Sequence, residues 1–300
     1  MESNMEQREM QAGEKGTGRE ETGELDRLFL DLPPREAYPL ILAKAWEGSG
    51  RALFLLALYL DGGYGIFFLD KGLARAYASA AAQAGDPVAP AFGALKDLPN
   101  VGESVRVFVR QRERIRALAA EGDFLAQYYL GIMYAYGEGE DPSYEDALAW
   151  FEQSAAQGFA AAQLAMGSFL RLVDGGKNGS WREKRLEWYQ KAAAKGYAEA
   201  QLRLAQEYRL HFHALEQAGI WYERAARQGH PAACEIMGTF WANGYVGQAD
   251  PARALAWYRR AYHRGSRTAC FAIASLYEEG RGVLQSWQQA ALWYKKFWER

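Results

Sequence analysis

A phrase that ends in glycine recurs along this chain at a nearly constant interval, and this period restricts the folds that the chain can adopt. "DALAWFEQSAAQG", "RLEWYQKAAAKG", "AGIWYERAARQG" and "ALAWYRRAYHRG" each place an aromatic pair eight and seven residues before the glycine. Successive closing glycines are 33 to 38 residues apart, which is the length of a helical hairpin. These marker glycines are Gly48, Gly85, Gly122, Gly158, Gly196, Gly229 and Gly265.

Small and large side chains keep a fixed register with the marker glycines. Alanine stands four residues after every marker, and alanine or glycine stands nine residues after it. Eight residues before the next marker position, six of the seven units carry a large aromatic side chain, with Arg114 as the exception. Because a core packs densely only when bulky and small groups interleave, each unit is predicted to be two antiparallel helices, with the aromatic wedge on the second. The wedge residues are Tyr77, Trp150, Trp188, Trp221, Trp257 and Trp293.

Turn and capping residues support the hairpins and extend them to a fold. Second helices begin after N-cap residues such as Ser180, Asp250 and Ser286, and the marker glycine suits the left-handed position after a helix end. A single hairpin cannot bury both of its faces, so neighbouring hairpins must stack. We therefore predict an all-α, right-handed solenoid of about seven antiparallel helical hairpins, with repeat frames starting at 48, 85, 122, 158, 196, 229 and 265.

The stretch before the first marker has two parts. Residues 1–24 are charged, rich in glycine and glutamate and poor in large apolar groups, so we expect a disordered tail. Residues 25–47 carry apolar side chains at helical spacing, and we expect a helical lead-in or N-terminal cap. The repeat region is then 48–300.

The repeat motif resembles the Sel1-like repeat family, whose members are relatives of tetratricopeptide repeats. The resemblance covers about residues 48–300, although the second unit (85–121) departs from it with Arg114, Pro87 and Pro90 and has no Gly-x-Gly loop. It implies a superhelical scaffold for protein contacts, which the family uses in bacteria and in eukaryotic protein quality control, without specifying a partner. In the third unit the motif is Ala126, Leu130, Gly131, Tyr134, Gly137, Gly139, Ala147, Trp150 and Gly158.

No motif in the sequence indicates catalysis, a metal or a cofactor. Some cysteine-rich relatives of the family have been linked to β-lactam hydrolysis, but the chain contains neither Ser-x-x-Lys nor Lys-Thr-Gly. Cys234 and Cys270 occupy the same position of consecutive units, where helix spacing of about 8–10 Å exceeds disulfide reach, so we expect buried thiols. His211 and His213 lack further ligands at zinc spacing and are interpreted as a polar loop.

Net charge and hydropathy limit the classes of partner that the protein is expected to bind and the cellular compartment in which it is expected to occur. A net charge of −2 gives no broad field that would attract nucleic acid or anionic membranes. No apolar run of about 18 residues and no secretory signal is visible, so we expect a cytoplasmic protein with no membrane contact. Arg106, Arg110 and Arg114 share one helix face, either as a basic stripe for an acidic protein segment or as a solvated face paired with Glu113 or Glu121.

The first helices of the first three units are apolar almost all round. The face of these helices that lies opposite the packed one is called the apolar arc. It must be covered, either by residues 25–47 or by a partner's helix or extended peptide. In the second alternative the anchors are Phe54, Phe92, Tyr128 and Tyr129. The matching arc of the fifth unit is mostly polar and includes Arg203.

At the far end, Phe297 and Trp298 replace the Ala-Ala of inner units, as a plug or as the face of a weak dimer, so we expect a monomer or weak dimer. The resulting functional prediction is a non-catalytic scaffold, adaptor or regulator that binds a partner protein segment through the solenoid groove. An immunity-type protein that neutralises a cognate toxin is the alternative within the binding class. A β-lactamase-like hydrolase is the alternative from another class, and the missing Ser-x-x-Lys disfavours it.

Overall fold

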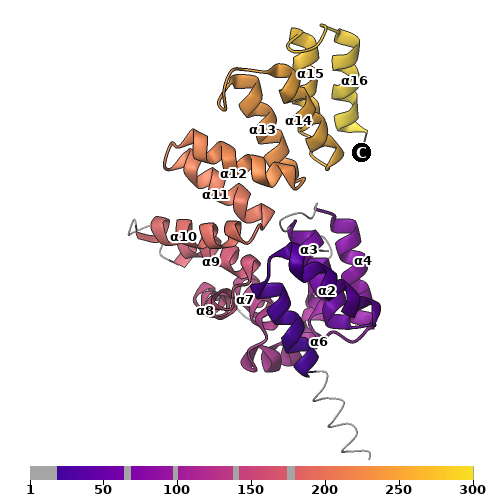
Figure 1. Cartoon of the computed structure of the whole chain (residues 1–300), viewed down its shortest axis with the longest axis vertical. Helices are drawn as coiled ribbons and strands as arrows, with labels where there is room; N and C mark the ends of the chain where they lie inside the picture. Colours follow the sequence, from indigo (N-terminus) through magenta and orange to yellow (C-terminus); the bar gives the residue numbers. More distant parts are fainter. Residues whose placement is uncertain (1–18, 64–68, 97–100, 138–141, 174–179, 300) are drawn as a thin grey trace, which may run out of the picture. The chain divides into compact units, whose positions relative to one another are not determined.

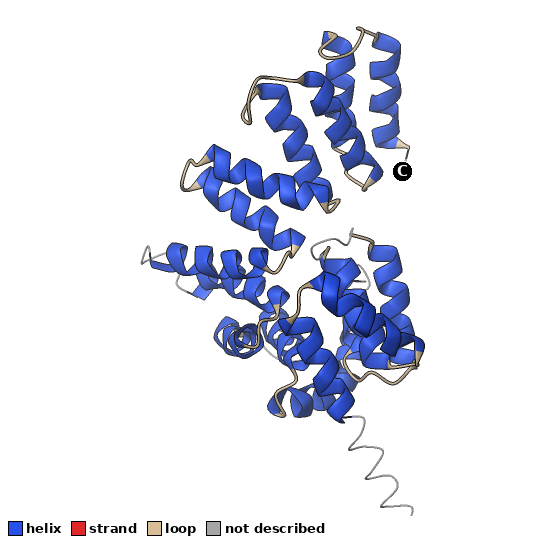
Figure 2. Ribbon diagram, in the orientation of Figure 1, coloured by secondary structure: helices blue, strands red, loops and turns tan. Residues whose placement is uncertain are grey.

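The computed structural model describes residues 19–63, 69–96, 101–137, 142–173 and 180–299. Within these ranges all regular secondary structure is helical (Figure 2), as predicted for an α-solenoid. The chain divides into two compact units. We call them the N-terminal unit, which contains the residues up to Tyr59 and Lys71–Phe159, and the C-terminal unit, which contains Leu60–Asp70 and Ala160–Arg300.

Consecutive helices pack as pairs within each unit (Figure 1). In the N-terminal unit a helix over residues 19–31 precedes α2 (Pro34–Trp46), α3 (Gly50–Gly62), α4 (Lys71–Gln83), α5 (Ala89–Lys96), α6 (Val101–Ala120), α7 (Phe124–Tyr136) and α8 (Tyr144–Ala156). The C-terminal unit holds α9 (Ala160–Val173), α10 (Ser180–Ala194), α11 (Ala198–Leu210), α12 (Leu215–Arg227), α13 (Pro231–Asn243), α14 (Pro251–His263), α15 (Ala269–Glu279) and α16 (Trp287–Trp298).

The marker glycines and the alanines that follow them behave as the repeat pattern predicts. All seven markers have positive φ, between 82° and 100°, which is the left-handed region that only glycine enters without strain. The alanines four residues later are buried in every unit, each with no more than 2% of its surface exposed. Capping also agrees where side chains are described, since Asp250 and Ser286 accept hydrogen bonds from the main-chain N–H of Arg253 and Gln289.

The aromatic side chain that fills the small position is one residue later than the sequence prediction. The rings of Phe151, Tyr189 and Tyr258 lie against Gly131, Gly167 and Gly238, and each follows a tryptophan directly. A Cβ atom on Gly238 would lie 2.5 Å from the Tyr258 ring. The tryptophans are turned about 100° around the helix axis and are mostly half-buried, so the assignment of Trp150, Trp188 and Trp257 as the wedges is corrected.

The N-terminal segment packs on the first helices of the first and third hairpins. The first helix begins at residue 19, inside the stretch expected to be a tail, because Leu25 and Phe29 bury their side chains against the repeats. The ring of Phe29 lies 4.8 Å from that of Tyr59 and 6.2 Å from that of Phe124. Tyr38 of α2 makes an edge contact with Tyr59 at 6.3 Å.

In the C-terminal unit, residues from the loop after α3 pack on the ends of second helices. The main-chain N–H of Leu69 donates to the carbonyl of Gln228, 3.1 Å away. The guanidinium group of Arg264 donates to the carbonyl of Leu69 at 3.3 Å. This explains why Leu60–Asp70 belongs to the C-terminal unit.

The end of the repeat array has one packed and one exposed aromatic side chain. Phe297 lies 4.4 Å from the Phe271 ring and its carbonyl accepts a hydrogen bond from Arg267, as a plug requires. Trp298 is 75% exposed. Weak dimerisation through this end stays a prediction.

A glycine-to-alanine substitution is predicted to have opposite effects at two helical positions. Gly238→Ala forces a methyl group into the Tyr258 ring and should lower the free energy of unfolding by about 1–3 kcal/mol. Gly23→Ala meets nothing within 4 Å and should raise it by about 0.5–1 kcal/mol, because alanine favours the helix. Thermal unfolding followed by circular dichroism measures both. Equal shifts of the melting temperature in the two variants would contradict the close packing of the Tyr258 ring against Gly238.

Both cysteines are free and buried, as predicted. Burial raises the pKa of the Cys234 thiol to about 11, so little nucleophilic thiolate forms near neutral pH. We expect neither thiol to react with Ellman's reagent at pH 8 until denaturant is added, and then both to react. Rapid reaction of the native protein, or no free thiol in denaturant, would show that the packing or the redox state differs.

Candidate protein-binding site

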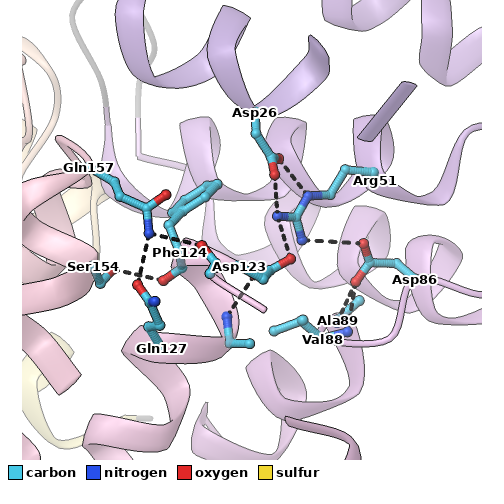
Figure 3. A network of polar contacts seen from close by, with 12 residues as sticks. Asp26, Arg51, Asp86, Val88, Ala89, Asp123, Phe124, Gln127, Ser154 and Gln157 are labelled. Carbon is cyan, nitrogen blue, oxygen red and sulfur yellow. Dashed lines mark hydrogen bonds and ion pairs between the residues drawn. The ribbon is translucent and has the colours of Figure 1, made fainter. Parts of the chain in front are cut away.

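A buried arginine in the N-terminal unit gathers three aspartates from different segments. Nε of Arg51 lies 2.7 Å from Oδ1 of Asp26, and Nη2 lies 2.8 Å from its Oδ2. The same Nη2 is 2.9 Å from Oδ2 of Asp123, and Nη1 is 3.8 Å from Oδ2 of Asp86. Figure 3 shows the guanidinium group between these carboxyl groups. The side chain of Arg51 is only 5% exposed.

The repeat itself positions two of the three aspartates. Asp86 and Asp123 directly follow the markers Gly85 and Gly122 and stand at the start of α5 and α7. Oδ1 of Asp123 accepts from the main-chain N–H of Ala126, and Oδ1 of Asp86 accepts from two N–H groups (Figure 3). Each Asp therefore caps a helix with one oxygen and turns the other toward Arg51. Asp26, from the helix over residues 19–31, completes the set.

Amide side chains support the Asp123 turn from the neighbouring helix. Nε2 of Gln157 donates to the carbonyl of Gly122 at 2.9 Å and to Oε1 of Gln127 at 2.8 Å. Ser154 Oγ donates to the carbonyl of Phe124 at 2.7 Å (Figure 3). These bonds connect α8 to the beginning of α7, so the Asp123 carboxyl group is held by a rigid support.

The cluster contains more negative than positive charge. Burial raises the pKa of Asp26 and of Asp86 above the usual 3.8, although Arg51 acts to lower both. Burial also disfavours the charged form of Arg51, but Asp123 and Asp26 outweigh this and raise its pKa above that of a free arginine. One guanidinium group therefore leaves the three carboxyl groups incompletely neutralised, and a further cation near them is electrostatically favoured.

A cleft of about 890 Å³ opens beside this cluster. Its walls include the turns at Gly48, Gly85 and Gly122, so three successive hairpins contribute the same structural element. Arg19 and Glu121 form an exposed ion pair at 3.1 Å on this lining. The ionisable residues of the lining are two arginines and five acids, namely Arg19, Arg51, Glu21, Asp26, Asp86, Glu121 and Asp123.

Sequence reasoning had not identified this cluster, although the sequence contains two indications of it. Arg51 is the one charged member of an otherwise apolar helix arc, and a Gly-Asp pair recurs at the second and third markers. A lone cation in an apolar arc requires a buried counter-charge. The contribution of Asp26 could not be derived, because it depends on how the N-terminal helix lies on the repeats.

The structure places three of the predicted anchors in the core. Phe54, Phe92 and Tyr129 are each no more than 3% exposed, and the Phe54 ring lies 5.8 Å from Phe92 and 6.4 Å from Tyr129. Their contact with a partner would require the covering helices to move, because these rings have almost no accessible surface. Tyr128 is half-buried between Phe151 and Phe159. Arg203 is exposed and pairs with Glu199 at 2.8 Å.

The basic stripe is described only in part. Arg114 is exposed on α6, whereas the side chains of Arg106 and Arg110 lie outside the described residues. Glu113 pairs with Arg116 at 3.8 Å, and Glu121 pairs with Arg19. The stripe as a binding surface therefore stays a prediction.

Metal-binding and membrane-spanning features were also sought in the described ranges. His211 lies 3.8 Å from a Glu207 carboxylate oxygen, and no three His, Cys, Asp or Glu side chains among the described residues are grouped to hold a metal ion. Every helix in the same part of the chain is too short or too polar to traverse a bilayer.

The stacked hairpins with glycine-marked turns define an α-solenoid repeat protein. The Sel1 repeat family matches at residues 50–86, 125–159, 183–197, 198–230, 231–266 and 268–297, which together make more than half of the chain. The chain belongs to the Sel1 repeat family, whose members generally act as non-catalytic scaffolds for protein interactions. Most of the second unit, which holds Arg114, Pro87 and Pro90, lies outside the matches.

Solved structures show the same fold. A protective antigen present in uropathogenic Escherichia coli strains is 27% identical, with a TM-score of 0.55, over 87% of this chain and 56% of the antigen. This chain thus spans little more than half the length of that protein. A Sel1 repeat protein from Oxalobacter formigenes is 24% identical, with a TM-score of 0.55, over 67% of this chain and 81% of its own.

An immunity protein from Pseudomonas aeruginosa is 19% identical, with a TM-score of 0.45, over 66% of this chain and 74% of its own. Likeness at this level concerns the fold alone. A search of curated proteins found no match.

Removing the central cation is predicted to be far more damaging than removing one carboxylate. Arg51→Met leaves three buried acids without their cation and should lower the free energy of unfolding at pH 7.5 by about 3–5 kcal/mol. Asp86→Asn retains a capping side chain and removes excess charge, so it should change stability by less than about 1 kcal/mol. Chemical denaturation of the wild type and of both variants measures the free energies of unfolding to be compared.

The stability cost of Arg51→Met is predicted to depend on pH, and the raised pKa values of Asp26 and Asp86 give the sign of this dependence. The pKa values of Asp26 and Asp86 are raised on folding, so the folded unit binds protons more tightly than the unfolded chain, and its stability falls as pH rises through the folded-state pKa. Lowering the pH from 7.5 toward 4.5 should therefore reduce the Arg51→Met deficit, because the acids take up protons. A deficit that is constant over this range would show that charge is not its cause.

Proposed function

We propose that this protein is a non-catalytic interaction scaffold whose N-terminal cleft accepts a cationic side chain from a segment of a partner protein. The observation that carries the proposal is the excess of five acids over two arginines on the lining of one cleft. Clefts lined by one sign of charge concentrate ligands of the opposite sign. The scaffold role of the Sel1 repeat family supports the same class of function.

The shape of the cleft favours a chain segment over a compact ligand. Equivalent glycine turns from three hairpins form its walls, so the lining repeats along the direction in which the hairpins stack. A segment can place successive residues on successive turns. Its lysine or arginine would lie near Glu21 and Glu121, where carboxylates are accessible, while Arg51 stays buried beneath.

We place this function in a bacterial cell, as an adaptor or regulator in the cytoplasm. The likeness to an Escherichia coli antigen, at 27% identity, supports a bacterial source. An immunity function is a special case of the same binding, in which the segment belongs to a toxin.

Reversing the charge of two side chains at the opening of the cleft should abolish binding of the partner protein without unfolding this protein. Glu21→Lys with Glu121→Lys changes the lining from acidic toward basic, and the Arg19–Glu121 pair is exposed and contributes no more than about 1 kcal/mol. Tagged wild type and variant are used to capture proteins from the native host, followed by quantitative mass spectrometry. We expect a partner that is lost by at least about tenfold with the variant.

The matched control is Glu152→Lys, which reverses a charge at an exposed position on α8 of the same unit. It should keep the partner, and thermal melting should show that both variants are folded. A partner retained by the Glu21→Lys, Glu121→Lys protein, or lost equally with the control, would remove the cleft from the binding site. Identification of the captured protein as a toxin would establish the immunity function.

A further inference from the structure

The second helices of the C-terminal unit carry a repeated pair of side chains that the cleft does not use. In each of them a lysine or arginine three residues after the tryptophan lies over its ring. The distances from the cation to the ring centroid are 4.3 Å on α10, 4.4 Å on α12, 5.4 Å on α14 and 3.9 Å on α16. We call these pairs the Trp–cation row: Trp188 with Lys191, Trp221 with Arg224, Trp257 with Arg260, and Trp293 with Lys296.

The row is a property of the C-terminal unit and not of every repeat. At the position five residues before the marker, the first three hairpins have Ala80, Ala117 and Gln153 instead of a cation. The four later hairpins have only lysine or arginine there. Because hairpins stack in register, equivalent positions lie along one side of the unit, and the row presents one positive charge for each hairpin.

The cations of the row are held in place before any ligand arrives. Each ring is partly or largely buried in the seam beneath its cation, so the charged group lies on a fixed aromatic surface. Arg260 is held further, because its Nη2 donates to the carbonyl of Arg227 at 2.8 Å. Immobilised side chains lose little additional conformational freedom when they bind a counter-charge.

Members of the row differ in electrostatic pairing from two of the cations close to them. Arg227 pairs with Glu223 at 2.8 Å, and Lys295 pairs with Glu299 at 3.1 Å. Among the residues that the structure describes, Lys191, Arg224 and Lys296 form no ion pair with a carboxylate. A carboxylate thus neutralises some of the cations beside the row, whereas these three members of the row keep their positive charge available.

We propose that the Trp–cation row binds an acidic segment of a partner protein, with carboxylates of the segment meeting successive hairpins. A carboxylate is the counter-charge that neighbouring arginines and lysines already use in this unit. Nucleic acid fits less well, because cations cover the tryptophan faces on which bases would stack, and the chain has a net charge of −2. The row lies in a different unit from the acidic cleft and selects the opposite charge. The two binding sites can therefore be tested independently, and failure of one does not affect the other.

The test uses the full-length protein and a fluorescein-labelled poly-glutamate peptide, with binding followed by fluorescence anisotropy. Arg224→Gln with Lys296→Gln removes two charges of the row and keeps the tryptophans. Lys184→Gln with Lys295→Gln removes two exposed charges from the same unit, at positions outside the row. We expect the row variant to weaken peptide binding by at least about tenfold, and the control to change it by less than about twofold.

Salt and competing polymers complete the test. Binding should weaken as sodium chloride rises from about 50 to about 300 mM, because the Debye length shortens. Circular dichroism checks that each variant is folded. Absence of poly-glutamate binding, or equal weakening in the row and control variants, overturns the proposal. Tighter binding of a single-stranded oligonucleotide that depends on the same two residues overturns it in favour of nucleic acid.

Discussion

The fold of this protein depends on a contact, repeated in three of its hairpins, between an aromatic ring on the second helix and a glycine on the first. Gly131, Gly167 and Gly238 leave room for the rings of Phe151, Tyr189 and Tyr258, and a single added methyl group would overlap the ring. This close approach sets the angle at which the two helices of a hairpin meet. Because the same contact recurs in these three hairpins, they present equivalent surfaces to their neighbours, which favours stacking.

The repeat pattern was sufficient to predict the architecture because the period, the turn glycines and the small positions are all local properties of the sequence. The wedge was assigned one residue too early, since both members of the Trp-Tyr pair are large and only the helix rotation distinguishes them. The acidic cluster was missed for a different reason. Asp86 and Asp123 belong to the repeat, but Asp26 comes from a helix outside it, and its contact with Arg51 spans a distance that no periodicity describes.

The residues predicted to anchor a partner protein also show how far the sequence alone can be interpreted. The apolar arc was correctly inferred to need a cover, and both possible covers satisfied the sequence equally well. In the structure Phe54, Phe92 and Tyr129 of this arc are buried, and Phe29 of the N-terminal helix packs its ring on Tyr59 and Phe124 of the same first helices. The two units offer surfaces of opposite charge, with acids around the first three hairpin turns and cations over the tryptophans of the last four hairpins.

One position of the repeat links neighbouring helices in two different ways. Gln127 and Gln201 each donate to a carbonyl of the preceding second helix, Ala119 or Ala193, and accept from a glutamine at the end of their own hairpin. Cys234 stands at the same position, and its thiol reaches only the carbonyl of Ala226 at 3.4 Å. A weak thiol bond restrains the rotation of one helix on another less than two amide bonds do. The solenoid is consequently stiffer at Gln127 and Gln201 than at the α12–α13 seam, where a small twist can adapt the spacing of the surface cations to the segment that they are proposed to bind.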